Sequence, residues 1–273
     1  MNRKSFVAIV ALLSLAVGFQ SRAHAQRHER VFAKDGSGVF GYKTTPLQPW
    51  SGFQVHDPDR PLPPKVTPGE PSTQDKAGTA PSDAIALFDG KDLSQWKPNG
   101  WKVEDGELVA IDGMLTSKEE FGDCQLHVEW LVPTEPAEVI TNRGNNGLFF
   151  LGEIEVQIFD SYEYTTKIYA DGQAAAIYAQ TPPLVNSSRK PGEWQTFDIV
   201  FSAPKLDDDG KVVASARITM LHNGVLVHNN QEIYGHTPHA GLASYKSVKP
   251  KGPIAFGAHH CPVRFRNIWI RPL

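Results

Sequence analysis

The sequence lacks several features that mark common classes of protein. Its 273 residues hold only two cysteines, too few for a disulfide-dense mini-scaffold or a four-cysteine zinc site. The net charge of −3 and the absence of a basic cluster exclude a typical nucleic-acid-binding footprint. We find no serine nucleophile elbow, P-loop, dinucleotide fingerprint or HExxH motif. We therefore expect neither a nucleic-acid partner nor the chemistry that these motifs support.

The first 25 residues have the layout of a secretory signal peptide. Two basic residues precede an uncharged apolar run at 6–19, and Ala23-His24-Ala25 supplies an A-x-A cleavage site. The run is shorter than the ~20 residues that span a bilayer, and no later run is apolar enough, so we expect no stable membrane anchor. We expect the chain to be exported and cleaved near Ala25, which would change its charge from −3 to −6. Export permits a disulfide between Cys124 and Cys261, with two free thiols as the alternative.

Residues 26–82 are rich in proline and show no sustained strand or helix period. Nine prolines lie in this stretch, and proline cannot donate the backbone hydrogen bond of a strand ladder or helix interior. We predict an irregular leader. Its aromatic half, residues 41–57, could pack on the domain or on a partner, and residues 69–81 are expected to form a flexible tether. The predicted division is therefore a signal peptide at 1–25, a leader at 26–82 and one domain at 83–273.

The domain at 83–273 has the pattern of an all-β sandwich. Short apolar or alternating runs recur between turn signals, and in residues 125–131 the side chains of Leu126, Val128 and Trp130 share one face. Asn223-Gly224 between two such runs predicts a hairpin. About 190 residues in short strands suit a two-sheet jelly roll. The alternating polar residues form either a sugar-binding face or a solvated one.

One predicted strand carries a row of polar side chains. Glu153, Glu155 and Gln157 share a face, because side chains two residues apart point the same way. The spacing resembles the Glu-x-Asp-x-Glu strand of retaining β-glucanases. Gln157 stands where the third acid would be, and an amide cannot act as an acid or base. The sequence therefore argues against a conventional glucanase that uses two carboxylates.

Histidine and arginine side chains add further candidates near the C-terminus. His259 lies at the end of a predicted strand, where it could be a general base, a metal ligand or a surface residue. Arg264 and Arg266 alternate in the last strand and could bind an oxyanion or a carboxylate, or only cover a sheet edge. These residues become informative only in combination with the motifs around them.

Several ordered motifs recur along residues 84–273. They are LFDGKDLSQW at 87–96, NNGLF at 145–149, EVQIFDS at 155–161, GEWQ at 192–195, and His259 with FRNI at 265–268. Together they resemble the 3-keto-disaccharide hydrolase family. Two departures stand out: Leu151 replaces the usual arginine, and Gly257-Ala258-His259-His260 replaces Gln-Asp-His-Gly.

The resemblance implies a concanavalin-like jelly roll that cleaves 3-keto-glycosides. A ketone at C3 acidifies the C2–H, a base removes that proton, the C1 oxygen leaves by β-elimination, and water then adds. The alternative is a non-catalytic carbohydrate-binding module that uses the same concave face. Under the first reading, a carbohydrate is the substrate, a divalent metal is a candidate cofactor, and the base is His259 or Glu155. The candidate sugar-binding residues are Gln157, Arg266, Glu129, Asn146 and Tyr178, with Asp160 as a support for the metal or the histidine.

Overall fold

A computed structural model describes residues 29–135, 138–164 and 167–273 of the chain. The predicted signal peptide at 1–25 lies outside the described residues. The chain divides into two compact units, Met1–Lys65 and Val66–Leu273. In the described part of the first unit, β1 (Arg30–Phe32) and β2 (Phe40–Tyr42) form an antiparallel pair. The predicted leader is therefore not irregular throughout. None of the helices in the described ranges has the length and hydropathy of a membrane span.

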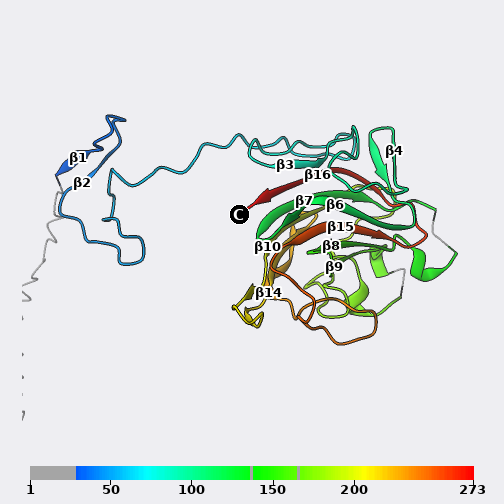
Figure 1. Cartoon of the computed structure of the whole chain (residues 1–273). Helices are drawn as coiled ribbons and strands as arrows, with labels where there is room; N and C mark the ends of the chain where they lie inside the picture. Colours follow the sequence, from blue (N-terminus) through cyan, green and yellow to red (C-terminus); the bar gives the residue numbers. More distant parts are fainter. Residues whose placement is uncertain (1–28, 136–137, 165–166) are drawn as a thin grey trace, which may run out of the picture. The chain divides into compact units, whose positions relative to one another are not determined.

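The second unit contains two antiparallel sheets that pack face to face, as the layers of Figure 1 show. The larger sheet runs in the order β14-β13-β10-β7-β16-β5-β4, and β3 also pairs with β16. Its strands are β3 (Ile85–Phe88), β4 (Lys102–Glu104), β5 (Glu107–Val109), β7 (Cys124–Leu131), β10 (Gln195–Ser202), β13 (Arg217–His222), β14 (Val225–Glu232) and β16 (Arg264–Pro272).

The smaller sheet runs in the order β6-β15-β8-β9. Its strands are β6 (Gly113–Phe121), β15 (Gly252–Ala258), β8 (Asn146–Phe150) and β9 (Ile154–Ile158). A short ribbon pairs β11 (Lys205–Leu206) with β12 (Val212–Ala214). The helical turns in the described ranges are 3-10 turns: η1 (Ile140–Asn142), η2 (Tyr162–Tyr164) and η3 (Ala170–Gly172).

The hydrophobic core fills the space between the two sheets. Phe150 of the small sheet stacks on Phe201 of the large one at 4.4 Å between ring centroids. Phe256 and Phe265 meet across the same space at 4.8 Å. Such aromatic pairs add about 0.5–1.5 kcal/mol to the stabilisation from area burial. The predicted all-β, two-sheet jelly-roll sandwich is confirmed.

Local signals in the sequence explain how strands of the large sheet form and how two of them are joined. Leu126, Val128 and Trp130 are fully buried, as the alternation in this strand predicts. The predicted hairpin at Asn223-Gly224 connects β13 and β14, and both residues adopt positive φ angles of 53° and 78°. This backbone suits a two-residue turn whose twist matches the flanking strands.

The two cysteines do not form the disulfide that export would permit. Cys124 and Cys261 are buried free thiols, which is the alternative stated for them.

Residues 69–81 do not form the flexible tether expected from their composition. They belong to the second unit and lie along the outer face of the large sheet. The Gln74 side chain donates to the Trp194 carbonyl at 2.9 Å, and its oxygen accepts from the Trp194 N–H at 2.7 Å. Proline removes backbone donors but leaves carbonyl acceptors, so side-chain donors of the sheet can still hold the segment. We call residues 69–81 the strap.

Candidate functional site

The small sheet carries a cleft of about 550 Å³ on the face that points away from the core. Its floor comes from β9, and loops that are distant in the sequence form its walls. The lining residues are Thr141, Asn142, Asn145, Glu155, Gln157, Phe159, Ile168, Tyr169, Tyr178, Thr237, His239, His259 and His260. Four of the predicted site residues, Glu155, Gln157, Tyr178 and His259, are therefore brought together.

The period of β9 explains why two polar side chains reach the cleft. Ile154, Val156 and Ile158 are fully buried in the core, so Glu155 and Gln157 point to the opposite face. Their backbone is held on the free side of the strand, where the Ala175 N–H donates to the Gln157 carbonyl at 2.8 Å. The loop that contains Ala175 thus extends the sheet beyond β9. It fixes Glu155 and Gln157 at the cleft floor.

Glu155 is the acid among the described residues that line the cleft. Its side chain is nearly inaccessible, with 8 % exposure for the residue. Burial raises the pKa of its carboxyl to about 7, from an ordinary value of 4.5. A carboxyl that titrates near neutral pH can both accept and return a proton, as a general base must. Such shifts in a cleft mark candidates for catalysis.

Tyr178 is tied to Glu155 through the backbone. Its N–H donates to the Glu155 carbonyl at 3.0 Å, and its hydroxyl lies 3.0 Å from that of Tyr169. Burial, the contact with Tyr169 and nearby acids all raise the pKa of Tyr178. The hydroxyl therefore stays protonated and remains a hydrogen-bond donor at neutral pH.

Two histidines line the cleft from the loop between β15 and β16. The His259 N–H donates to the Asn145 carbonyl at 3.2 Å, and its residue is exposed. His260 adopts a positive φ of 52°, and its Nδ1 lies 3.1 Å from an oxygen of Asp112. The backbone contact places the imidazole of His259 where a ligand in the cleft can reach it.

Asn146 and Asp160 lie near the cleft without lining it. The fully buried Asn146 donates to the carbonyls of Asn145 at 2.8 Å and Cys261 at 3.4 Å. Asp160 accepts from the Tyr162 N–H at 3.3 Å, and burial raises the pKa of its carboxyl. Within residues 29–135, 138–164 and 167–273, no three His, Cys, Asp or Glu residues cluster as a metal site would require. The divalent metal stays an expectation from the sequence and enters no step below.

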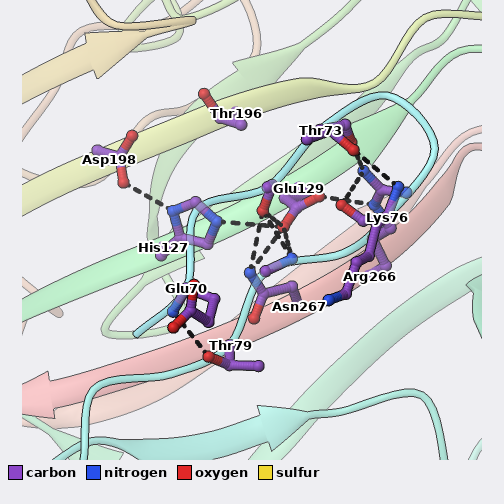
Figure 2. A network of polar contacts seen from close by, with 12 residues as sticks. Glu70, Thr73, Lys76, Thr79, His127, Glu129, Thr196, Asp198, Arg266 and Asn267 are labelled. Carbon is purple, nitrogen blue, oxygen red and sulfur yellow. Dashed lines mark hydrogen bonds and ion pairs between the residues drawn. The ribbon is translucent and has the colours of Figure 1, made fainter. Parts of the chain in front are cut away.

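Glu129 and Arg266 lie on the outer face of the other sheet. Arg266 Nε donates to Glu129 Oε2 at 2.6 Å, and its guanidinium stacks 4.1 Å above the Trp194 ring. Figure 2 shows the strap over this pair, with Arg266 donating to the Thr73 carbonyl at 2.5 Å. These two predicted sugar-binding residues are thus separated from the cleft. Sequence alternation places them on an outer face but gives no sign that the strap covers it.

A bulge in β16 concentrates donors on Glu129. The pairing of β16 with β7 shifts register between Arg266 and Trp269, and Asn267 has a positive φ of 45°. Consecutive side chains therefore turn to the same face, and Asn267 Nδ2 also reaches Glu129 Oε1 at 2.6 Å. The Ser72 hydroxyl of the strap donates to the same oxygen.

The charges around Glu129 keep it ionised. Burial pushes its pKa upward, but hydrogen bonds from His127, Ser72, Asn267 and Arg266 outweigh this and lower the pKa to about 2. Burial also acts against the charged form of His127, yet Asp198 and Glu129 raise its pKa to about 9. The contact from His127 Nδ1 to Asp198 measures 2.7 Å. Its charged groups lie in opposite pairs, although His127 Nε2, 3.5 Å from Glu129 Oε1, makes no hydrogen bond.

Sequence reasoning missed two residues of the cleft wall. Thr237 and His239 come from a loop that shows no strand period. Thr237 Oγ1 accepts from the Glu155 N–H at 2.9 Å, although 82 positions separate the two residues. No local pattern reports such a contact, so only the fold brings these residues to β9.

Comparisons with known proteins agree with this architecture. The profile of the family described as the 3-keto-alpha-glucoside-1,2-lyase-like domain matches residues 83–271. A candidate glycosyl hydrolase of known structure from Parabacteroides distasonis is 39% identical, covering 82% of this chain and 98% of its own, with a TM-score of 0.74. No curated protein matches the sequence.

A second candidate glycosyl hydrolase from the same organism shows the fold alone. It is 22% identical, covers 70% of this chain and 99% of its own, and has a TM-score of 0.53. The match at 83–271 begins after the strap, whereas the compact unit begins at Val66. The strap is therefore part of the folded unit here, although the family match does not include it.

Proposed function

Because the chain belongs to the 3-keto-alpha-glucoside-1,2-lyase-like domain family, we propose that it cleaves the glycosidic bond of 3-keto-glycosides in the cleft over β9. Membership makes it a glycosidase-like domain that acts on carbohydrates. The observation that carries the proposal of 3-keto-glycoside cleavage is Glu155, a buried carboxyl with a pKa of about 7 in that cleft. We also propose that the chain is exported after cleavage near Ala25.

Glu155 would act as the base at C2. The ketone at C3 makes the C2–H acidic, and the carboxylate of Glu155 takes that proton while the C3 oxygen gains charge. Tyr178 lines the same cleft, and its protonated hydroxyl would stabilise this oxygen. Glu155 suits this role better than His259, because the Glu155 carboxyl is buried whereas His259 is exposed.

The elimination and hydration then balance with water as the other reactant. The C1–O bond breaks as a C1–C2 double bond forms, and protonated His259 gives its proton to the departing oxygen. Water then adds its hydroxyl to C1, and Glu155 returns its proton to C2 while His259 takes one from the water. The two groups end in their starting protonation states, so the cycle can repeat. No pair of glycosidase carboxylates is needed, which agrees with Gln157 at the third position of the row.

The test compares a 3-keto-disaccharide with its unoxidised parent, each with and without a chelator. We expect cleavage of the keto form alone. Glu155→Gln should lower turnover by about 10²–10⁴-fold, the usual contribution of a general base. The matched control, Glu120→Gln on an exposed site of β6, should retain full turnover.

Three other outcomes would contradict the proposal. Cleavage of the parent sugar would indicate a conventional glycosidase. Binding without cleavage would indicate the carbohydrate-binding module instead, a reading that the replacements beside His259 favour. Full turnover by both Glu155→Gln and His259→Ala would remove the two residues from the chemistry.

A further inference from the structure

Gln157 occupies a position in the cleft floor that its assigned contact with sugar does not explain. It is only 3 % exposed, two residues after Glu155 on β9. In the orientation that satisfies its neighbours, the side-chain NH2 donates to Glu155 Oε1 at 3.1 Å and to the Asn146 carbonyl at 3.0 Å. One nitrogen thus bridges the candidate base and the backbone of β8.

The site that receives the Glu155 carboxyl is shaped on its other side by glycine. Gly147 of β8 pairs with Gln157, and a Cβ at this glycine would clash with Glu155 Oε1 and with the Phe149 ring. The backbone of Gln157 is fixed as well, because its N–H donates to the Ala176 carbonyl at 2.9 Å. The carboxyl therefore lies in a preformed space with one neutral donor beside it.

The chemistry of an amide suits this place better than that of an acid. A carboxylate at 157 would face two acceptors, the Glu155 carboxyl and the Asn146 carbonyl oxygen. Two carboxyls in contact would share one proton and titrate as a pair. The amide always carries its hydrogens and has no charge, so Glu155 can ionise as a single group. The other titratable groups around the cleft are Tyr169, Tyr178, His239, His259 and His260.

We propose that Gln157 is a positioning residue, whose amide holds the Glu155 carboxylate in the cleft and lets it exchange one proton independently of any second acid. The role of Glu155 as base rests on the proposed function, whereas the contact itself does not. The Gln157 amide acts through Glu155 and need not touch the sugar.

The test titrates the side-chain carboxyl carbon of Glu155 by 13C NMR in the full-length protein. Glu155→Gln identifies its signal by removing it. We expect Gln157→Met to raise the pKa of Glu155, weakening its acidity by about 2–12-fold, because one hydrogen bond to the charged form is lost. Gln157→Glu should replace the single step by two coupled steps, one on each side of the wild-type midpoint.

The matched control is Gln125→Met on β7, which also replaces a strand glutamine but lies on the other sheet. It should leave the Glu155 titration unchanged. Turnover of a 3-keto-glycoside adds a second readout. Gln157→Glu should keep activity only between the two midpoints, where one shared proton lets the second carboxyl donate as the amide does. Gln157→Met should lose activity across the whole pH range.

The two readouts separate this inference from the proposed function. If the wild type does not cleave the keto sugar but the Glu155 titration shifts as stated, the proposed function fails and the positioning contact stands. If Glu155 titrates in both variants as it does in the wild type, the inference is overturned, whatever the turnover. Thermal melting of each variant confirms that the measured protein is folded.

Discussion

Two buried glutamates, one on each sheet, differ in almost every property that matters for chemistry. Glu129 on β7 is fully inaccessible, pairs with Arg266 at 2.6 Å and has a pKa of about 2. Glu155 on β9 is almost as buried, but its neighbour is the neutral amide of Gln157, and its pKa is about 7. Burial is thus common to both residues, and the surrounding groups decide whether the acid stabilises the fold or remains available for proton transfer.

The difference extends to how the protein covers each acid. The strap lies over Glu129 and supplies Ser72 and main-chain carbonyls to its network. The cleft of about 550 Å³ leaves Glu155 beside space for a ligand. We therefore expect opposite consequences when the same substitution, glutamate to glutamine, is made at the two positions.

The largest effect should come from Glu129→Gln. It leaves the charge of Arg266 buried without its carboxylate, whereas His127 keeps Asp198. Breaking a buried pair costs about 3–5 kcal/mol of unfolding free energy. The pKa of Glu129 is below the unfolded value of 4.5, so its contribution is present above pH 4.5 and is lost as the pH falls through about 2. Urea unfolding at pH 7 measures the loss. A change no larger than that of Glu120→Gln would show that the network does not stabilise the fold.

The second prediction has the opposite sign. The pKa of Glu155 is about 7 in the folded state, above its unfolded value of 4.5, so its charge destabilises the fold at high pH. Glu155→Gln should raise the unfolding free energy by about 3 kcal/mol at pH 8.5 and change it little at pH 4. The gain should grow as the pH rises from 4.5 through 7. Equal effects at both pH values would refute the assigned titration.

The smallest of these effects tests the strap. Gln74→Ala removes both hydrogen bonds to Trp194, and each is worth about 0.5–1.5 kcal/mol. We expect a loss of about 1–2 kcal/mol in unfolding free energy, with no change in turnover at the distant cleft. Lys76→Ala is the matched control, since its side chain is exposed and only its backbone contacts the sheet. If Gln74→Ala melts like this control, the strap is not held as described.

Sequence reasoning succeeded where apolar and polar side chains alternate along a strand, or where a turn has a specific sequence. The alternation of residues 125–131 predicted β7, and Asn223-Gly224 predicted the turn between β13 and β14. It did not predict β6, whose second half is the polar run Ser117 to Glu120. Only Leu115, Ser117 and Phe121 of that strand are buried, so little apolar alternation marks it.

The candidate site was predictable only in part, for a physical reason. The period of β9 places Glu155 and Gln157 side by side, because local geometry determines that relation. No sequence pattern indicates which sheet carries a cleft. Sequence reasoning therefore groups Glu129 and Arg266 with Glu155, although the fold places them on the other sheet. The composition of residues 69–81 also does not predict that they pack on the sheet. Their contacts depend on the Arg266 side chain, almost 200 positions later.

The most direct test of the account is a single 13C titration of the glutamate carboxyls in the wild-type protein. The account predicts that Glu155 gains its proton near pH 7, while Glu129 stays ionised until about pH 2. If both glutamates instead titrate near the ordinary value of 4.5, the proposed division between a structural acid and a candidate base is contradicted.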